Sequence, residues 1–174
     1  DDRLLAAPAH VLSGGETSAF SQDRATRRAR AQLAELAQRA WSGDATVIGI
    51  CLGAQLLARA IAPELPCSTP ERGMEAGWQH VEEEGRRATE AVAELHYEQI
   101  HPALESVDGV EVTHRNDHSP IQAFRWGAAF GMQFHPEWSP TDLRAVLRRH
   151  RRLLAERHHD PRQATASVRG DRRR

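Results

Sequence analysis

The sequence predicts an α/β fold, because a helix, a buried strand and a second helix follow one another along the chain. From Gln22 to Ala40, apolar residues recur at helical spacing with arginines between them, which is typical of an amphipathic surface helix. Residues 46–50, Thr-Val-Ile-Gly-Ile, form a nearly continuous apolar run, as expected of a strand buried on both faces of a parallel sheet. Residues 54–61 are again helical in composition, and Pro63 ends that helix. This order indicates helices layered against a sheet.

The later part of the chain is predicted to add strands and one more helix. Residues 77–81 and 91–95 each have the composition of a strand and flank a charged turn, and residues 130–134 form another apolar run. Ser139, followed directly by a proline, has the pattern of a helix N-cap. The apolar stripe of that last helix extends to Leu154, so we expect one continuous helix there.

Length and composition place the chain among ordinary globular proteins. Its 174 residues suit one domain, which we expect at residues 1–158, followed by a disordered Arg-rich tail at 159–174. A formal net charge of -1 argues against a dedicated nucleic-acid binder, and no apolar run reaches the roughly 18 residues of a membrane span. The two cysteines, Cys51 and Cys67, make no disulfide framework, so the expected compartment is the cytoplasm.

The predicted strand at 46–50 leads directly into a Gly-x-Cys-x-Gly pattern at residues 49–53. A sharp strand-to-helix turn would hold Cys51 in a strained backbone conformation, and bulky neighbours would clash there, which explains the two glycines. Such a turn places Cys51 at a helix N-terminus, where the partial positive charge favours the thiolate. The alternative is a small buried cysteine at a strand end, which is the commoner role of a lone cysteine.

Residues 134–137, Phe-His-Pro-Glu, form a second pattern with chemical meaning. In extended backbone, residues two apart point to the same side, so Glu137 can accept a hydrogen bond from the ring of His135. The other ring nitrogen can then serve a nucleophile. By itself the segment could be a surface turn. Together with the cysteine turn, it predicts a Cys-His-carboxylate site at the strand ends of one sheet.

Other polar residues indicate no further chemistry. His101, His114 and His118 lack convincing spacing for metal ligands, so we expect no metal site. The sequence contains no Gly-rich phosphate loop, and we expect no cofactor.

Two motifs resemble the class I (triad) glutamine amidotransferases: residues 49–58, Gly-Ile-Cys-Leu-Gly-Ala-Gln-Leu-Leu-Ala, and residues 131–137, Gly-Met-Gln-Phe-His-Pro-Glu. Residues 75–78, Glu-Ala-Gly-Trp, and 118–125, His-Ser-Pro-Ile-Gln-Ala-Phe-Arg, also resemble this family, especially its stand-alone and GMP-synthase-type members. The resemblance extends roughly from Val11 to Leu154. It implies a flavodoxin-like, three-layer sandwich in which a mostly parallel sheet carries helices on both faces.

The resemblance also implies a site. Its catalytic triad would consist of Cys51, His135 and Glu137. Backbone amides of a two-glycine loop and of the residue after the nucleophile would stabilise the oxyanion, and a glutamine and one further loop would contact the substrate glutamine. The residues in these positions are Gly14, Gly15, Leu52, Gln55, His96 and Tyr97.

Three departures from the family pattern lead to further expectations. Little chain precedes Ser13, so the first βαβ unit of the family is expected to be missing. Glu16 follows the two glycines where the family has proline, which would put a carboxylate near the oxyanion. Residues 96–98, His-Tyr-Glu, replace a Trp-His-Gly-Asp type of stretch.

We therefore predict a glutaminase that hydrolyses glutamine and supplies ammonia to a partner synthase or another acceptor enzyme. The alternatives are a γ-glutamyl hydrolase or peptidase on the same fold, and a catalytically silent member that binds a partner. Related cysteine hydrolases usually carry a histidine directly after the nucleophile, whereas this chain has Leu52, which favours the amidotransferase function. Partners other than proteins and glutamine, namely nucleic acid and membranes, are not expected.

Overall fold

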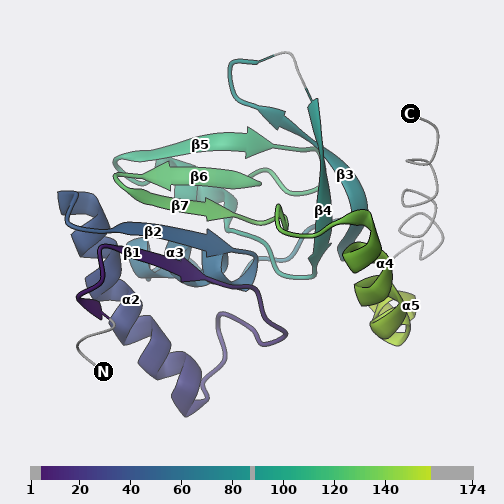
Figure 1. The fold of residues 1–174 in the computed structure, drawn as a ribbon, viewed down its shortest axis with the longest axis horizontal. Helices are drawn as coiled ribbons and strands as arrows, with labels where there is room; N and C mark the ends of the chain where they lie inside the picture. The colour runs from purple at the N-terminus through teal and green to yellow at the C-terminus, as the bar shows by residue number, and fades with distance from the viewer. Residues whose placement is uncertain (1–4, 87–88, 158–174) are drawn as a thin grey trace.

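Seven strands form a single mixed sheet in the computed structural model, which describes residues 5–86 and 89–157 (Figure 1). The strands are β1 (Ala9–Leu12), β2 (Thr46–Ile50), β3 (Glu75–Glu83), β4 (Thr89–His96), β5 (Val110–Arg115), β6 (Ala123–Trp126) and β7 (Ala129–Met132). Their order across the sheet is β1-β2-β7-β6-β5-β3-β4. Each predicted strand is present, with ends within two residues of those expected.

The α/β fold class is confirmed, and the parallel pairing lies at one end of the sheet. β1 pairs with β2 and β2 pairs with β7 in parallel, whereas the other four pairings are antiparallel. Short connections explain the antiparallel part. Only Gly127 and Ala128 separate β6 from β7, and a two-residue turn can join strands in no other way. The turn uses the positive φ of Gly127, 59°.

Helices pack beside the strands at both ends of the sheet. They are α2 (Arg24–Ser42), α3 (Leu52–Ile61), the short 3-10 helix η1 (Pro102–Ser106), α4 (Pro140–Arg149) and α5 (Arg151–Arg157). Helix α2 begins at Asp23, whose side chain accepts a hydrogen bond from the backbone N–H of Thr26, and ends at Gly43 with a φ of 82°. The two helices expected before and after β2 are both confirmed.

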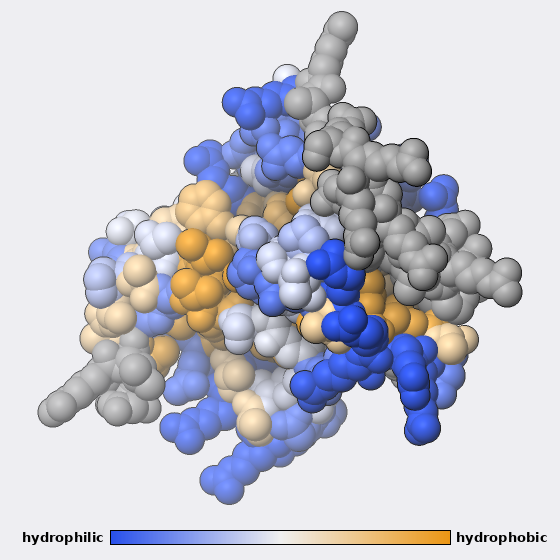
Figure 2. All heavy atoms as spheres, turned by 45° about the vertical axis from the view of Figure 1, so that its right-hand side comes forward, coloured by the Kyte–Doolittle hydropathy of each residue, from blue (hydrophilic) through white to orange (hydrophobic). Residues whose placement is uncertain are grey.

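The larger apolar core lies between α2, α3 and one face of the sheet. Leu36 of α2 and Leu57 of α3 belong to the same buried cluster as Phe124 of β6. On the opposite face, Val11 is 66% exposed and Phe130 is 38% exposed, so the described helices cover one face of this part of the sheet. On the face that Figure 2 shows, hydrophilic side chains surround smaller areas of exposed apolar ones.

Helix α4 packs against the β3–β4 hairpin at the other end of the sheet (Figure 1). Its apolar residues Leu143 and Leu147 join a second buried cluster with Ala93 of β4. Ser139 starts α4 with a capping box, as predicted. The expected single helix is divided at His150, where ψ is 14° instead of the roughly −42° of an α-helix, and continues as α5.

Within the described residues, no helix combines the length and apolar character needed to cross a membrane. The tail predicted at 159–174 lies outside the described residues.

We predict that Ser139→Ala lowers the free energy of unfolding by about 1 kcal/mol, because it removes the hydroxyl that accepts the N–H of Asp142. Urea unfolding measures this change. Thr141→Ala, at an exposed position in the first turn of the same helix, is the control. Its expected change in the free energy of unfolding is below about 0.5 kcal/mol. Equal losses in the two variants would contradict the capping interpretation.

Candidate active site

Cys51 is the single residue between the end of β2 and the start of α3, as the sequence predicted. Its φ of 50° and ψ of −110° lie outside the ordinary regions, and it is the one non-glycine residue with positive φ in the described chain. A backbone hydrogen bond of 2.8 Å from Cys51 N–H to the carbonyl of Met132 holds this conformation. The strained turn is typical of a nucleophile elbow.

The two glycines that flank Cys51 are required by close packing. A Cβ on Gly49 would lie 2.7 Å from the backbone nitrogen of Ala54, and a Cβ on Gly53 would lie 2.1 Å from the carbonyl oxygen of Leu12. Neither contact can be relieved by a side-chain rotation because both neighbours are backbone atoms. The elbow therefore fixes α3 against both β2 and β1.

Cys51 is a thiol in the resting site. It is 7% exposed, and burial together with the charge of Glu94 raises its pKa to about 12. The N–H of Leu52 at the start of α3 lowers the pKa, but by less than burial raises it. The helix N-terminus acts on Cys51 in the predicted direction, toward the thiolate, but desolvation outweighs it and the net pKa is raised.

His135 is oriented by three contacts. Its Nδ1 lies 2.7 Å from Oε1 of Glu137, the contact expected from the His-Pro-Glu spacing. Its ring stacks on Trp138 with centroids 3.6 Å apart and planes 5° apart. Its backbone N–H donates to the carbonyl of Ala93 at 2.8 Å. Burial lowers its pKa below the ordinary 6.5 although Glu137 acts in the opposite direction, so the ring is neutral at neutral pH.

The side chains of Cys51 and His135 flank the backbone of Gly14. A Cβ on Gly14 would lie 3.5 Å from Cβ of Cys51 and 2.9 Å from Cε1 of His135. A Cβ on Gly15 would lie 2.8 Å from Cδ2 of Leu52. Both glycines are thus needed where the loop after β1 passes over the cysteine and the histidine.

Glu16, which follows the two glycines, forms ion pairs with the end of α4. Its Oε1 lies 3.5 Å from Nε2 of His150 and 3.9 Å from Nη2 of Arg149, at the end of α4, and its side chain is 71% exposed. The carboxylate of Glu16 is thus engaged by the end of α4, and its effect on an oxyanion stays a prediction. Because the ion pairs are exposed, their contribution to stability is small.

The free edge of β4 supports both candidate catalytic residues. β4 is the last strand in the sheet, and its carbonyls at Ala93 and Leu95 are therefore available to other segments. The first accepts the N–H of His135, and the second lies 3.9 Å from Sγ of Cys51. Residues far apart in sequence thus share one strand edge as their support.

Three residues that the resemblance implied near the substrate make contacts within the protein. Gln55 donates through Nε2 to the carbonyl of Glu98 at 2.8 Å and to Oε1 of Gln133 at 3.2 Å. The His96 ring is buried, and its Nδ1 donates to the same Glu98 carbonyl. Tyr97 is half-buried against the apolar cluster beneath α4. These side chains connect α3, β4 and the segment that follows β4.

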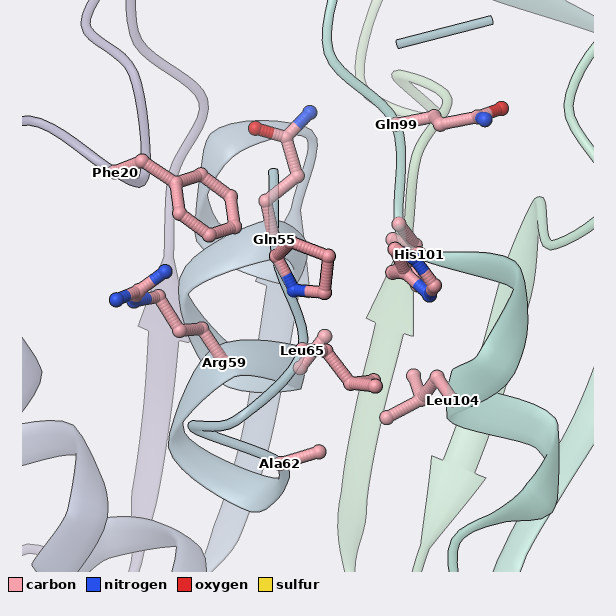
Figure 3. A pocket seen from close by; sticks show the side chains of 11 residues that line it. Phe20, Gln55, Arg59, Ala62, Leu65, Gln99, His101 and Leu104 are labelled. Atoms are coloured by element: carbon pink, nitrogen blue, oxygen red, sulfur yellow. The ribbon is translucent and has the colours of Figure 1, made fainter. Parts of the chain in front are cut away.

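A small pocket lies between α3 and residues 99–104, with Gln55 and Gln99 at one end and Ala62 at the other (Figure 3). Its volume of about 20 Å³ suits a single water molecule and is too small for an amino acid. Neither Cys51 nor His135 lines it. The pocket is therefore separate from the candidate catalytic groups.

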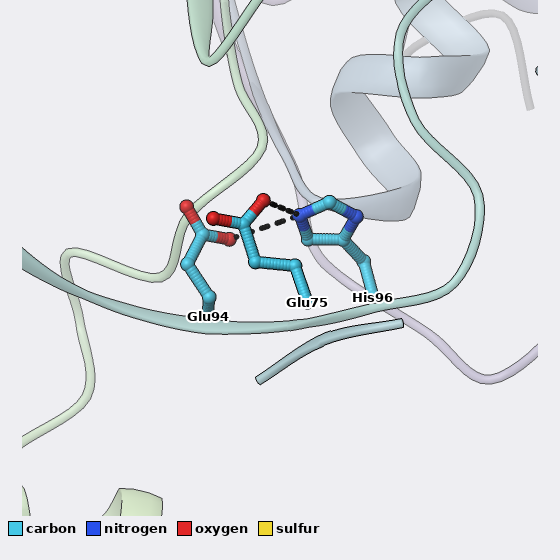
Figure 4. A group of neighbouring side chains, drawn as sticks. All are labelled: Glu75, Glu94 and His96. Atoms are coloured by element: carbon cyan, nitrogen blue, oxygen red, sulfur yellow. Dashed lines mark hydrogen bonds and ion pairs between the residues drawn. The ribbon is translucent and has the colours of Figure 1, made fainter. Parts of the chain in front are cut away.

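Among the described residues, one group has ligand atoms close enough to hold a metal ion: Glu75, Glu94 and His96, all within 4.8 Å of one another (Figure 4). Nε2 of His96 lies 3.1 Å from Oε2 of Glu75 and 3.3 Å from Oε2 of Glu94. Burial alone would lower the pKa of His96, but the two carboxylates raise it to about 10. Protonated His96 therefore hydrogen-bonds Glu75 through Nε2 and forms an ion pair with Glu94.

Sequence reasoning missed Trp138 and Glu94. The stacking of Trp138 has no sequence signal beyond its place three residues after His135. Glu94 did have a sequence signal. It lies two positions from His96 in a predicted apolar strand, and this spacing puts both side chains on one face of the strand.

Comparisons with known proteins agree with this architecture. The family model described as Glutamine amidotransferase class-I matches residues 8–151. No curated protein sequence matches the chain.

Three solved structures are similar. A glutamine amidotransferase from Thermotoga maritima has 22% identity and a TM-score of 0.72, over 92% of this chain and 70% of that one. A glutamine amidotransferase from Methylobacillus flagellatus has 23% identity and a TM-score of 0.64, over 79% of this chain and 55% of that one. A protein from Thermoplasma acidophilum described as a GMP synthase subunit has 18% identity and a TM-score of 0.58, over 88% of this chain and 79% of that one. At these identities the likeness shows a shared fold.

We predict that the His135 imidazole titrates below pH 6.5 and that Glu137→Gln lowers its pKa further, because the carboxylate stabilises the imidazolium. Assigned ring resonances followed by NMR across a pH series measure both values. Glu105→Gln, an exposed carboxylate that pairs with Arg115, is the control and is expected to leave the His135 pKa unchanged. A higher His135 pKa in Glu137→Gln would contradict the assignment of Glu137.

Proposed function

Because the chain belongs to the class I glutamine amidotransferase family, we propose that it hydrolyses the side-chain amide of glutamine through a thioester on Cys51. The ammonia released would pass to a partner synthase. One observation carries the proposal: the ring of His135, with Glu137 on its Nδ1 side, approaches Cys51 across Gly14. This proximity supports Cys51 as nucleophile, His135 as base and Glu137 as the carboxylate that orients the imidazole.

The first step is a proton transfer between neutral groups. The resting cysteine is a thiol, and burial keeps His135 neutral, so Nε2 can accept the thiol proton. Glu137 accepts the Nδ1–H and stabilises the imidazolium that forms. The stacked ring of Trp138 keeps the imidazole plane fixed while its charge changes.

The thiolate then attacks the amide carbon of glutamine and forms a tetrahedral oxyanion. Backbone N–H groups of Leu52 and of the Gly14–Gly15 loop would stabilise that charge. Ammonia leaves with the proton returned by His135, and a glutamyl thioester remains on Cys51. Water, deprotonated by His135, hydrolyses the thioester, so that glutamine and water become glutamate and ammonia.

A partner is part of the proposal because ammonium, the main form of ammonia at neutral pH, is no nucleophile. Delivery within a complex avoids protonation. The structural similarity to a protein described as a GMP synthase subunit supports an assembly of this kind.

We expect Cys51→Ser to abolish glutamate release from glutamine, because a serine hydroxyl is too weakly acidic for His135 to deprotonate in this site. A coupled glutamate assay measures the rate, and the unfolding midpoint verifies the fold. Cys67→Ser is the matched control, since Cys67 is exposed and distant in sequence, and it is expected to retain the parent rate. Equal rates of glutamate release in Cys51→Ser and the parent would disprove the mechanism.

We expect the purified chain by itself to turn over glutamine slowly and to accelerate when its synthase partner is added, because the Gly14–Gly15 loop would be ordered by the partner. Assays with glutamine and with a γ-glutamyl amine, without partner, measure the basal rates. Rapid turnover of glutamine alone would contradict the dependence on a partner. Rapid turnover of the γ-glutamyl amine but not of glutamine would favour the alternative γ-glutamyl hydrolase.

A further inference from the structure

The charged cluster of Glu75, Glu94 and His96 (Figure 4) is not used by the mechanism above, although its charges act on both Cys51 and His135. Glu94 and His96 share one face of β4, and Glu75 is paired with His96 across the β3–β4 hairpin. All three side chains are at most 2% exposed. Such a cluster is costly to bury, so its charges act strongly on their surroundings.

The two carboxylates of the cluster differ in the hydrogen bonds that they accept. Glu75 accepts hydrogen bonds from Asn116 at 2.6 Å and from Gln122 at 2.9 Å, in addition to its contact with His96. Neither oxygen of Glu94 has a well-aligned hydrogen-bond donor, and its contact is the 3.3 Å ion pair with Nε2 of His96. Because that one N–H also serves Glu75, Glu94 is the poorly compensated carboxylate of the cluster.

Protonation of the cluster reflects this difference. Burial would raise the pKa of Glu75, but His96 outweighs burial and holds it below the ordinary value. For Glu94, burial prevails and raises the pKa to about 7. With His96 an imidazolium and Glu75 ionised, the net charge of the cluster therefore changes from zero to −1 as Glu94 loses its proton near neutral pH.

Glu94 is also placed close to the reacting groups. The residues on either side of it, Ala93 and Leu95, are those whose carbonyls support His135 and Cys51. A charge at position 94 thus lies on the strand that both catalytic candidates contact.

We propose that Glu94 is a positioning residue whose buried carboxylate charge keeps Cys51 in its thiol form until His135 removes the proton. This inference rests on the proposed function for its biological meaning. It concerns the resting thiol, so it can be tested without glutamine. In the ionised state Glu94 opposes formation of a second negative charge on Cys51. In the protonated state this opposition disappears.

The test measures alkylation of Cys51 by iodoacetamide, whose rate follows the thiolate fraction. The protein carries Cys67→Ser, so that Cys51 is its one thiol. Glu94→Gln is compared with this parent by mass spectrometry at pH 6 and at pH 8.5. Glu90→Gln, an exposed carboxylate on the same strand, is the matched control and is expected to follow the parent at both pH values.

We expect Glu94→Gln to react at the parent rate at pH 6, where Glu94 is mostly protonated, and about tenfold faster at pH 8.5, equivalent to a Cys51 pKa lower by one unit. The other titratable groups that face Cys51 or Glu94 are Glu75, His96, His135 and Glu137. They are present in both proteins, and His96, whose pKa Glu94 helps to raise, keeps Glu75 as its partner in the variant.

A rate ratio that is constant with pH would indicate altered access to Cys51 and would overturn the proposal, as would a slower reaction at pH 8.5. If Glu94→Gln does not fold, Glu94→Leu removes the charge without leaving a buried polar group and gives the same expected ratio. Failure of the chain to hydrolyse glutamine would refute the proposed function but would leave this alkylation result unchanged.

Discussion

The tight turn at Cys51 is the constraint on which the rest of the site depends. With one residue between β2 and α3, the chain can turn only if Cys51 accepts a positive φ and its glycine neighbours present no side chains. Gly53 then touches the backbone of Leu12, which ties the edge strand to the start of the helix. This contact places the loop after β1 next to the cysteine. The glycines of that loop, Gly14 and Gly15, carry no side chain, which leaves space for the ring of His135.

Desolvation governs the chemistry of the site more than the helix dipole does. Burial keeps a proton on Cys51 and keeps His135 neutral, so the proposed proton transfer would start from two neutral groups and not from an ion pair. Fixed contacts on the far side of the imidazole, from Glu137 and Trp138, provide the preorganisation that the transfer needs. The carboxylate charge of Glu94 on β4 acts on the thiol of Cys51 through the protein interior, where the dielectric constant is low.

Local rules made part of this arrangement predictable from sequence. The cysteine turn and the His135–Glu137 contact depend on backbone geometry over five residues or fewer, so their patterns predicted them. Strand direction was less predictable, because it depends on which strands are neighbours. The protonation state of Cys51 was not predictable, because it depends first on burial of the thiol and then on Glu94. Both follow from tertiary packing, and Glu94 lies in a hairpin more than forty positions away in the sequence.

The use of the β4 edge as a support has a consequence for folding. Cys51 and His135 belong to opposite halves of the chain, and both rely on carbonyls of a strand that lies between them in sequence but at the far end of the sheet. Contacts of such large sequence separation carry a high loop-closure entropy and form late in folding. A partly folded chain can therefore contain the strained cysteine turn and still lack the imidazole of His135 beside it.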